Sequence, residues 1–283
     1  MRASLRARTY PEADHPASLD PWAALGTFGA RSAAMLLVIF LVLPIAALLW
    51  RSTTGEGFIR SVTQPLVIHA LLLTVITSLL TVGLSLLLGT PLAFLLARTN
   101  FAGKSLVEAA TTLPIVLPPL VAGVALLVAF GRRGVLGDQL EAIGVELPFT
   151  TAAVVLAQFF VSAPFYVRAA RLGFAAIPRE LEDAARVDGA SGWRTFQQIT
   201  IPLALPSIVS GLVLCAARAF SEFGATLMFA GNLEGRTQTM SLAIESAMNT
   251  DLGAALALSV VLIVIAAAAM AIPLIWLHGS EAL

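Results

Sequence analysis

Two side chains of opposite charge, Arg218 and Glu222, lie four residues apart in a long apolar stretch. On a helix this spacing puts both side chains on one face. Ionisable groups within a membrane-spanning segment are costly, and they usually face the bundle interior or a water-filled cavity. The pair can line or gate a path for a passing anion, or it can neutralise itself and fix helix packing. We favour a structural or gating role over direct contact with a substrate.

Four uncharged hydrogen-bonding side chains follow this pair: Thr226, Thr237, Gln238 and Thr239. Hydroxyl and amide groups can bind an anion in transit, or they can satisfy the backbone of a loop. The spacing leaves both roles open, and we include the four residues in a candidate translocation path.

Metal-site and disulfide chemistry are not indicated. His15, His69 and His278 are far apart in the sequence, and Cys215 is the single cysteine. None has a partner at ligand spacing, and one cysteine cannot form a disulfide within the chain. We therefore predict no metal site and no cofactor bound by this chain.

A nucleotide site is not indicated either. Gly103-Lys104-Ser105 is like the end of a phosphate-binding loop, but that loop needs a glycine five residues before Gly103, where Arg98 stands. No nucleophile–base pair is recognisable. We predict that the chain is not an enzyme.

The elements that position these residues are membrane helices. The 283 residues are 58% hydrophobic and only 12% charged, whereas soluble domains carry about 25% charged residues. Basic and acidic residues balance, so no basic field for nucleic acid exists. About six runs approach the roughly 20 apolar residues of a spanning helix. They are 32–50, 70–97, 109–130, 151–167, 206–230 and 252–277.

Two of these runs carry helix-breaking residues. Gly89 and Pro91 give the second run a place to tilt or break, and Pro114, Pro118 and Pro119 lie in the third. Prolines at membrane depth free backbone carbonyls, which are tolerated beside protein or a polar cavity. The third run is therefore either a helix beside the pore or a helix with a plain packing kink.

Orientation follows from the lysines and arginines of short loops, which favour the cytoplasmic side. With both termini cytoplasmic, more of them fall inside than outside. The inner set is Arg2, Arg6, Arg8, Arg31, Arg98, Lys104, Arg168, Arg171, Arg179, Arg186 and Arg194, and the outer set is Arg51, Arg60, Arg132, Arg133 and Arg236. We expect a cytoplasmic tail at 1–31, a transmembrane domain at 32–283, and lipid as the surrounding solvent.

The longest predicted inner loop, residues 173–205 between the fourth and fifth spans, reads as two short helices. Pro178 suits a first helical position, and the acids at 180, 182 and 183 suit a first turn. Gly189 suits a left-handed turn, and Ser191 can cap a second helix on which Trp193, Phe196 and Ile199 share a face. This loop can insert into a groove of a soluble partner or lie on lipid headgroups.

The same loop resembles the EAA loop of permeases from binding-protein-dependent ABC importers. Asp183-Ala184-Ala185, then Gly189 four residues on, then Ile199 to Pro202, matches the pattern Glu-Ala-Ala, Gly, Ile, Leu-Pro and its spacing. Asp183 replaces the Glu, although Glu182 precedes it, and Ile201 replaces the Leu. The resemblance implies that the loop docks on a cytoplasmic ATPase. The coupling residues it implies are Glu182, Asp183, Ala184, Ala185, Gly189, Ile199 and Pro202.

The stretch from Ala217 to Ile244 narrows the substrate. It is similar to the corresponding stretch of molybdate permeases, including Gly235-Arg236-Thr237-Gln238-Thr239, and sulfate permeases are similar mainly in its first half. Glu245 stands where many molybdate permeases have an aromatic residue. The resemblance implies import of molybdate, with tungstate or sulfate and thiosulfate as alternatives.

The resemblance also implies partners and a location. We expect a multi-pass protein of the bacterial inner membrane that works as a homodimer with two ATPase subunits, which use ATP and Mg²⁺, and an extracytoplasmic oxyanion-binding protein. Two other classes remain open: a carrier driven by an ion gradient, which often shows two similar halves, and a membrane scaffold without transport. We see no internal repeat.

Overall fold

The computed structural model describes residues 27–54 and 58–281, and these residues form helices joined by turns, without strands. The described residues divide into two units, with the boundary between Trp50 and Arg51. In chain order the elements are α2 (Thr27–Thr54), α3 (Phe58–Val62), α4 (Pro65–Arg98), α5 (Lys104–Val116), α6 (Pro119–Phe130), α7 (Gly137–Ala142), α8 (Thr151–Ala176), α9 (Arg179–Val187), α10 (Gly192–Thr195), the π-helical turn η1 (Phe196–Thr200), α11 (Ile201–Phe220), α12 (Gly224–Ala230), α13 (Met240–Met248) and α14 (Leu252–Glu281).

Helix α2 of the first unit is apolar along most of its length. Its segment Gly29–Thr53 is long and apolar enough to cross a bilayer. The helix begins at Thr27, inside the predicted tail, and residues 1–26 lie outside the described residues. The predicted boundary at Arg31 is wrong, because a long basic side chain near a helix end can reach the interface while the helix continues.

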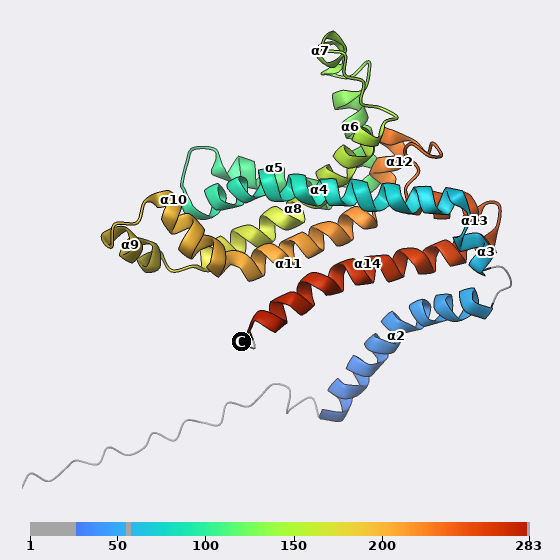
Figure 1. Cartoon of the computed structure of the whole chain (residues 1–283), viewed down its shortest axis with the longest axis horizontal. Coiled ribbons are helices and arrows are strands. Elements are labelled where there is room, and N and C mark those ends of the chain that lie inside the picture. Colours follow the sequence, from blue (N-terminus) through green and yellow to red (C-terminus); the bar gives the residue numbers. More distant parts are fainter. Residues whose placement is uncertain (1–26, 55–57, 282–283) are drawn as a thin grey trace, which may run out of the picture. The chain divides into compact units, whose positions relative to one another are not determined.

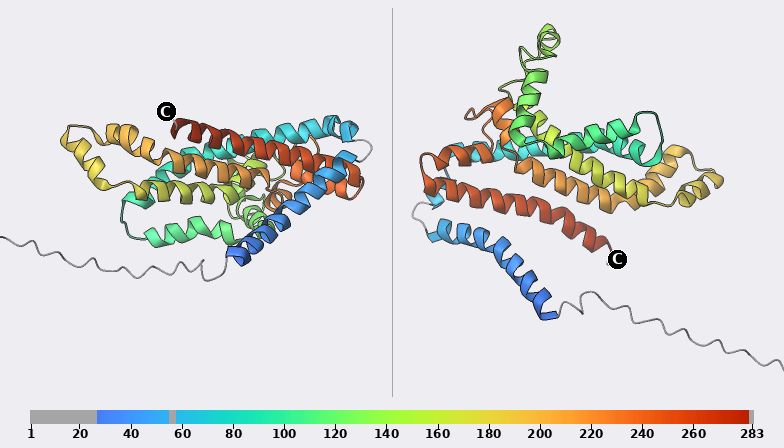
Figure 2. Two further views of the ribbon diagram at one scale, coloured as in Figure 1. Left: turned by 90° about the horizontal axis from the view of Figure 1, so that it is seen from below. Right: turned by 180° about the vertical axis from the view of Figure 1, so that it is seen from behind.

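Three long helices, α4, α8 and α11, lie side by side at the centre of the second unit (Figures 1 and 2). Tyr166 and Phe174 of α8 are fully buried, in one cluster with Leu96 of α4 and Cys215 of α11. Helix α14 begins beside α13 and packs along α11 (Figure 1). The resulting bundle fixes α8, whose two ends lead to the two candidate sites.

Small residues bring these helices close together. A Cβ added at Gly89 would lie 2.8 Å from the Tyr166 ring, and one at Gly173 would clash with the Ser207 Cβ. In lipid, close packing of this kind replaces the hydrophobic effect as a source of helix association. Of the two possibilities at Gly89 and Pro91, a tilt or a break, the break does not occur, because α4 runs unbroken through both residues. Gly89 instead provides the contact with α8.

The predicted third span, 109–130, is two helices rather than one. Helix α5 ends at Val116 and α6 begins at Pro119, with Leu117 in extended conformation between them. Pro118 has no N–H to donate and disfavours helical backbone in the residue before it, which explains the break. Five described helices are individually long and apolar enough to span a bilayer. A sixth crossing, made by α5 and α6 together, stays a prediction.

The two ends of the second unit carry different structures. Helices α9 and α10 lie at one end, and α12 and α13 lie at the other (Figure 1). At the second end α6 packs on α12, where a Cβ at Gly224 would lie 2.9 Å from the Pro119 Cβ. Each end holds one of the regions that the sequence singled out.

Candidate functional site

The loop between α8 and α11 is shorter than predicted. Helix α8 continues to Ala176, and the next long helical stretch already begins at Gly192, so the turn lies within the predicted 173–205. The predicted fourth span ended at Val167 because Arg168 and Arg171 were read as loop residues. The structure corrects this, since both arginines lie within α8 and line a polar cavity.

Helix α9 forms largely as its sequence indicates. Pro178 is the residue before the first helical position rather than the first position itself, and Glu180 and Glu182 lie in the first turn. Gly189 has a φ of 87°, and its N–H donates to the Arg186 carbonyl at 3.0 Å. This left-handed turn ends the helix as predicted.

The second short helix also begins as predicted. The Ser191 hydroxyl accepts from the Arg194 N–H at 3.3 Å, which caps α10. Trp193 stacks on Phe196 with ring centroids 5.8 Å apart. The helix then continues through the π turn η1 into α11, where the Ile201 N–H donates to the Phe196 carbonyl. The wider turn lies just before Pro202, which has no N–H to donate to the residue four positions earlier.

Glu182 holds this loop to the bundle. Its Oε1 accepts from Arg98 Nη2 at 2.9 Å and from the Thr200 hydroxyl at 2.8 Å. Arg98 also donates to the Ile177 carbonyl at 3.1 Å. The Glu182 side chain is 10% exposed, so these contacts carry most of its interactions. One carboxylate therefore joins α9, the end of α4 and η1.

Asp183, the neighbouring acid, has a different environment. It pairs with Arg186 at 3.1 Å, and both side chains are exposed. The sequence pattern aligned Asp183, not Glu182, with the acidic position of the EAA loop. The structure gives the buried anchoring role to Glu182.

The outer surface of the loop is exposed and partly apolar. Ala184 and Gly189 are exposed and Ala185 is half-buried. Val187 and Trp193 are 87% and 67% exposed. The remaining two predicted coupling residues lie closer to the bundle, with Ile199 half-buried in η1 and Pro202 exposed at the start of α11.

The predicted fifth span, 206–230, is interrupted at the opposite end of the bundle. Helix α11 ends at Phe220 and α12 begins at Gly224. Arg218 and Glu222 are therefore not on one continuous helix. The Glu222 carboxylate forms an ion pair with Arg218 Nη2 at 2.7 Å, and its other oxygen accepts from the Ala225 N–H at 2.6 Å. The Glu222 carboxylate therefore satisfies a backbone N–H in the first turn of α12, which has no partner within that helix. This contact stabilises the start of a new helix after Phe220.

The Arg218–Glu222 pair is neutralised within the chain. The Glu222 side chain is fully buried and that of Arg218 is 25% exposed. Because the Glu222 carboxylate already neutralises Arg218, the guanidinium has little capacity left to bind an anion. The geometry favours the structural or gating role over substrate contact.

The four polar residues beyond this pair are all buried: Thr226, Thr237, Gln238 and Thr239. The Thr237 hydroxyl accepts from the Leu233 N–H at 2.9 Å and lies 3.3 Å from the Gly231 carbonyl, so it supports loop backbone. The side-chain oxygens of the other three have no hydrogen-bond partner. Buried polar oxygens without partners are uncommon, and their role in a path stays a prediction.

Metal-binding geometry is not found in the described part of the chain, where no three histidine, cysteine or carboxylate side chains come together. The residues that sequence reasoning missed are Arg168, Arg171 and Glu108. Arg171 pairs with Glu108 of α5 at 2.8 Å. The available signal was the spacing of the two arginines, which puts them on one face if the helix continues beyond Val167.

Permeases of molybdenum and tungstate transport systems are similar to most of this chain. The molybdenum transport system permease protein ModB of Mycobacterium tuberculosis is 43% identical over 230 residues, which is 81% of this chain and 87% of that protein. The molybdate/tungstate transport system permease protein WtpB of Thermococcus kodakarensis is 39% identical over 210 residues, 74% of this chain and 76% of that protein.

A solved structure shows the same fold. It is a bacterial ABC transporter involved in the import of the acidic polysaccharide alginate, with a TM-score of 0.69 and 19% identity, covering 93% of this chain and 99% of that one. The family model of the binding-protein-dependent transport system inner membrane component matches residues 89–278, which include the end of α4, all of α8 and α11, and both candidate sites. The chain belongs to this family of inner membrane transport components.

Proposed function

We propose that this chain is the membrane-spanning permease subunit of an ATP-driven importer of molybdate. The observation that carries the proposal is the 43% identity to a molybdenum transport permease over 81% of the chain. The likeness to an ABC importer supports the fold on which such transport depends. Family membership favours this function over a gradient-driven carrier or a scaffold.

The anchored loop supplies a physical route for coupling. Two ATPase subunits that close on nucleotide would bind the exposed surface around Ala184 and Gly189 of two permease copies. Because Glu182 ties this loop to Arg98 and Thr200, a displacement of α9 is passed to α4 and α11. These helices pack on α8 along the centre of the bundle. Their movement would alternate the access of the path between the two sides.

The remaining parts of the assembly follow from the same proposal. An extracytoplasmic binding protein delivers the oxyanion, and both termini and the α9–α10 loop lie in the cytoplasm. ATP and Mg²⁺ belong to the ATPase subunits, and the permease itself catalyses no reaction. A homodimer supplies two loops for two ATPase subunits.

The testing experiment is ATP hydrolysis by the reconstituted complex with its binding protein, in molybdate, tungstate, sulfate or no oxyanion. Stimulation by molybdate supports the proposal. Tungstate is the second candidate, favoured by the similarity to a molybdate/tungstate permease, and stimulation by tungstate alone would make it the substrate. Stimulation by sulfate alone would contradict both, and a flat response would contradict importer function.

A further inference from the structure

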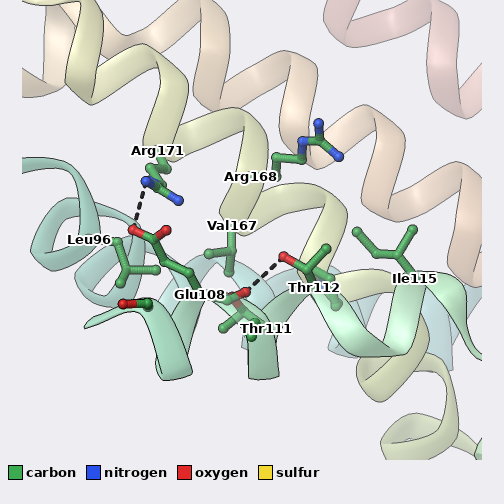
Figure 3. Close-up of a pocket in the computed structure, with 11 residues that line it drawn as sticks. Leu96, Glu108, Thr111, Thr112, Ile115, Val167, Arg168 and Arg171 are labelled. Atoms are coloured by element: carbon green, nitrogen blue, oxygen red, sulfur yellow. Dashed lines mark hydrogen bonds and ion pairs between the residues drawn. The ribbon is translucent and has the colours of Figure 1, made fainter. Parts of the chain in front are cut away.

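A polar cavity of about 510 Å³ lies between α5 and α8, in the half of α8 that leads to α9 (Figure 3). It is far larger than the roughly 10–15 Å³ that a single water needs. Its polar lining consists of Ser105, Glu108, Thr111, Thr112, Arg168 and Arg171. None of these residues belongs to the α9–α10 loop or to the region around Arg218 and Glu222.

The two arginines of this cavity are held differently. Arg171 forms an ion pair with Glu108 at 2.8 Å. Arg168 has no acidic or hydrogen-bonding partner among the residues that the structure describes. Figure 3 shows the Arg168 guanidinium apart from the joined Arg171 and Glu108. The cavity therefore holds two cations and one carboxylate, which leaves an excess positive charge.

The position of Arg168 makes an unpartnered charge unusual. The helix rises ~12 Å between Arg168 and its end at Ala176. This part of α8 belongs to a segment long and apolar enough to span a bilayer. An ionisable side chain in such a segment is costly and marks a substrate or ion pathway by default.

The hydrogen-bond donors of the cavity also point to Arg168. The hydroxyls of Thr111 and Thr112 donate to the Glu108 carbonyl at 2.9 and 2.8 Å, so they are engaged. Toward the residues that the structure describes, the guanidinium of Arg168 keeps its donors free, in a planar fork that matches two oxygens of an oxyanion.

We propose that this cavity is a transient binding site for a free tetrahedral oxyanion on the cytoplasmic side of the path, with Arg168 as its principal ligand. The inference rests on the proposed function and deepens it. Arg171 adds positive charge, and Glu108 offsets part of it so that the anion leaves after binding. The Arg218–Glu222 pair, which carries no excess charge, has no such capacity.

The first test is equilibrium binding of radiolabelled molybdate to the whole nucleotide-free complex in nanodiscs of zwitterionic lipid. Arg168→Gln should raise the dissociation constant about tenfold, the size of one charge-assisted contact. Arg168→Lys, which keeps the charge but not the fork, should raise it less. Arg133→Gln removes an exposed arginine that does not line the cavity, and it should leave binding unchanged. Equal binding by wild type and Arg168→Gln would overturn the proposal.

A second measurement leaves Arg168 in place and therefore does not depend on the stability of its variants. Thr112→Cys puts a thiol on the cavity wall, and Cys215 is buried. Molybdate should slow modification of the new thiol by a charged thiol reagent, and chloride should not. Modification that molybdate leaves unchanged would overturn the proposal. Modification that slows only in anionic lipid would also overturn it, and would assign Arg168 to a lipid phosphate.

Failure of this inference can be told apart from failure of the proposed function. If molybdate stimulates ATP hydrolysis by the wild-type complex while Arg168→Gln binds and transports normally, only the cavity site is wrong. If molybdate stimulates nothing in the wild type, the importer proposal itself is wrong.

Discussion

Arg218 and Arg168 both belong to helices long enough to span a bilayer, yet the two regions around them differ in one respect. Arg218 faces a fully buried carboxylate at 2.7 Å, and that carboxylate also caps α12. Arg168 faces an open cavity and has no partner in the described part of the chain. The Arg218–Glu222 pair stabilises the interruption between α11 and α12, whereas the charge of Arg168 stays available to a ligand.

This difference shows that a charge at depth does not by itself identify a path. The buried pair is costly to break because removing one member leaves the other uncompensated. Removal of Arg168 leaves no uncompensated charge among the described residues, so it should change anion binding more than assembly. The two regions can therefore be separated by measuring assembly and transport independently.

The largest effect is expected for Arg218→Ala. The fully buried Glu222 would lose its counter-charge, and breaking a buried pair costs about 3–5 kcal/mol. We expect a lower yield of assembled complex and a lower thermal midpoint in detergent. The double variant Arg218→Ala/Glu222→Gln, which removes both charges, should recover much of this stability. Normal assembly with lost transport would instead place Arg218 in the path.

A smaller effect is expected for Glu182→Gln. Arg98 would keep a hydrogen bond but lose its carboxylate, at about 1–3 kcal/mol for an incompletely satisfied buried group. Because the loop would be tied less firmly to α4, substrate-stimulated ATP hydrolysis should fall toward the unstimulated rate. The matched control Asp183→Asn affects an exposed pair and should change little. A larger loss of stimulated ATP hydrolysis in Asp183→Asn than in Glu182→Gln would mean that Asp183, as the motif indicates, is the coupling acid.

Local signals in the sequence predicted local structure well. The Gly189 turn, the Ser191 cap and two of the three acids predicted for the first turn of α9, Glu180 and Glu182, depend on backbone groups a few residues away, and the structure confirms them. The all-helical character also followed from composition. These features need no knowledge of distant contacts.

Features that depend on tertiary contacts were predicted less well. Reading α8 as ending before Arg168 treated the charge as a boundary, because the cavity that accommodates it involves α5, some sixty residues earlier in the chain. The break after Phe220 was missed because Glu222 was expected to continue the helix, whereas its carboxylate caps the next one. In both places, at Arg168 and at Glu222, the helix boundary depends on a tertiary contact or a cavity that cannot be predicted from the periodicity of the sequence.

Gly189→Val tests the loop through its backbone alone. Gly189 has a φ of 87° and no atom near its would-be Cβ, so the cost comes from conformation and not from a clash. A left-handed conformation costs roughly 1–2 kcal/mol for a residue with a Cβ, and more for a β-branched one. Substrate-stimulated ATP hydrolysis should be lost while membrane insertion is normal. Gly189→Asn, which tolerates this conformation better, should retain more activity, and wild-type transport by the valine variant would remove the coupling role of this turn.

The smallest effect is expected for Glu146→Gln. Glu146 pairs with Arg132 at 2.7 Å, the same distance as in the Arg218–Glu222 pair, but its side chain is 61% exposed and that of Arg132 is 74% exposed. Water solvates either charge when the partner is removed, so exposed pairs contribute about 0–1 kcal/mol. The thermal midpoint and transport should stay close to those of the wild type. A loss as large as that of Arg218→Ala would mean that distance, and not burial, decides what a charge pair does in this protein.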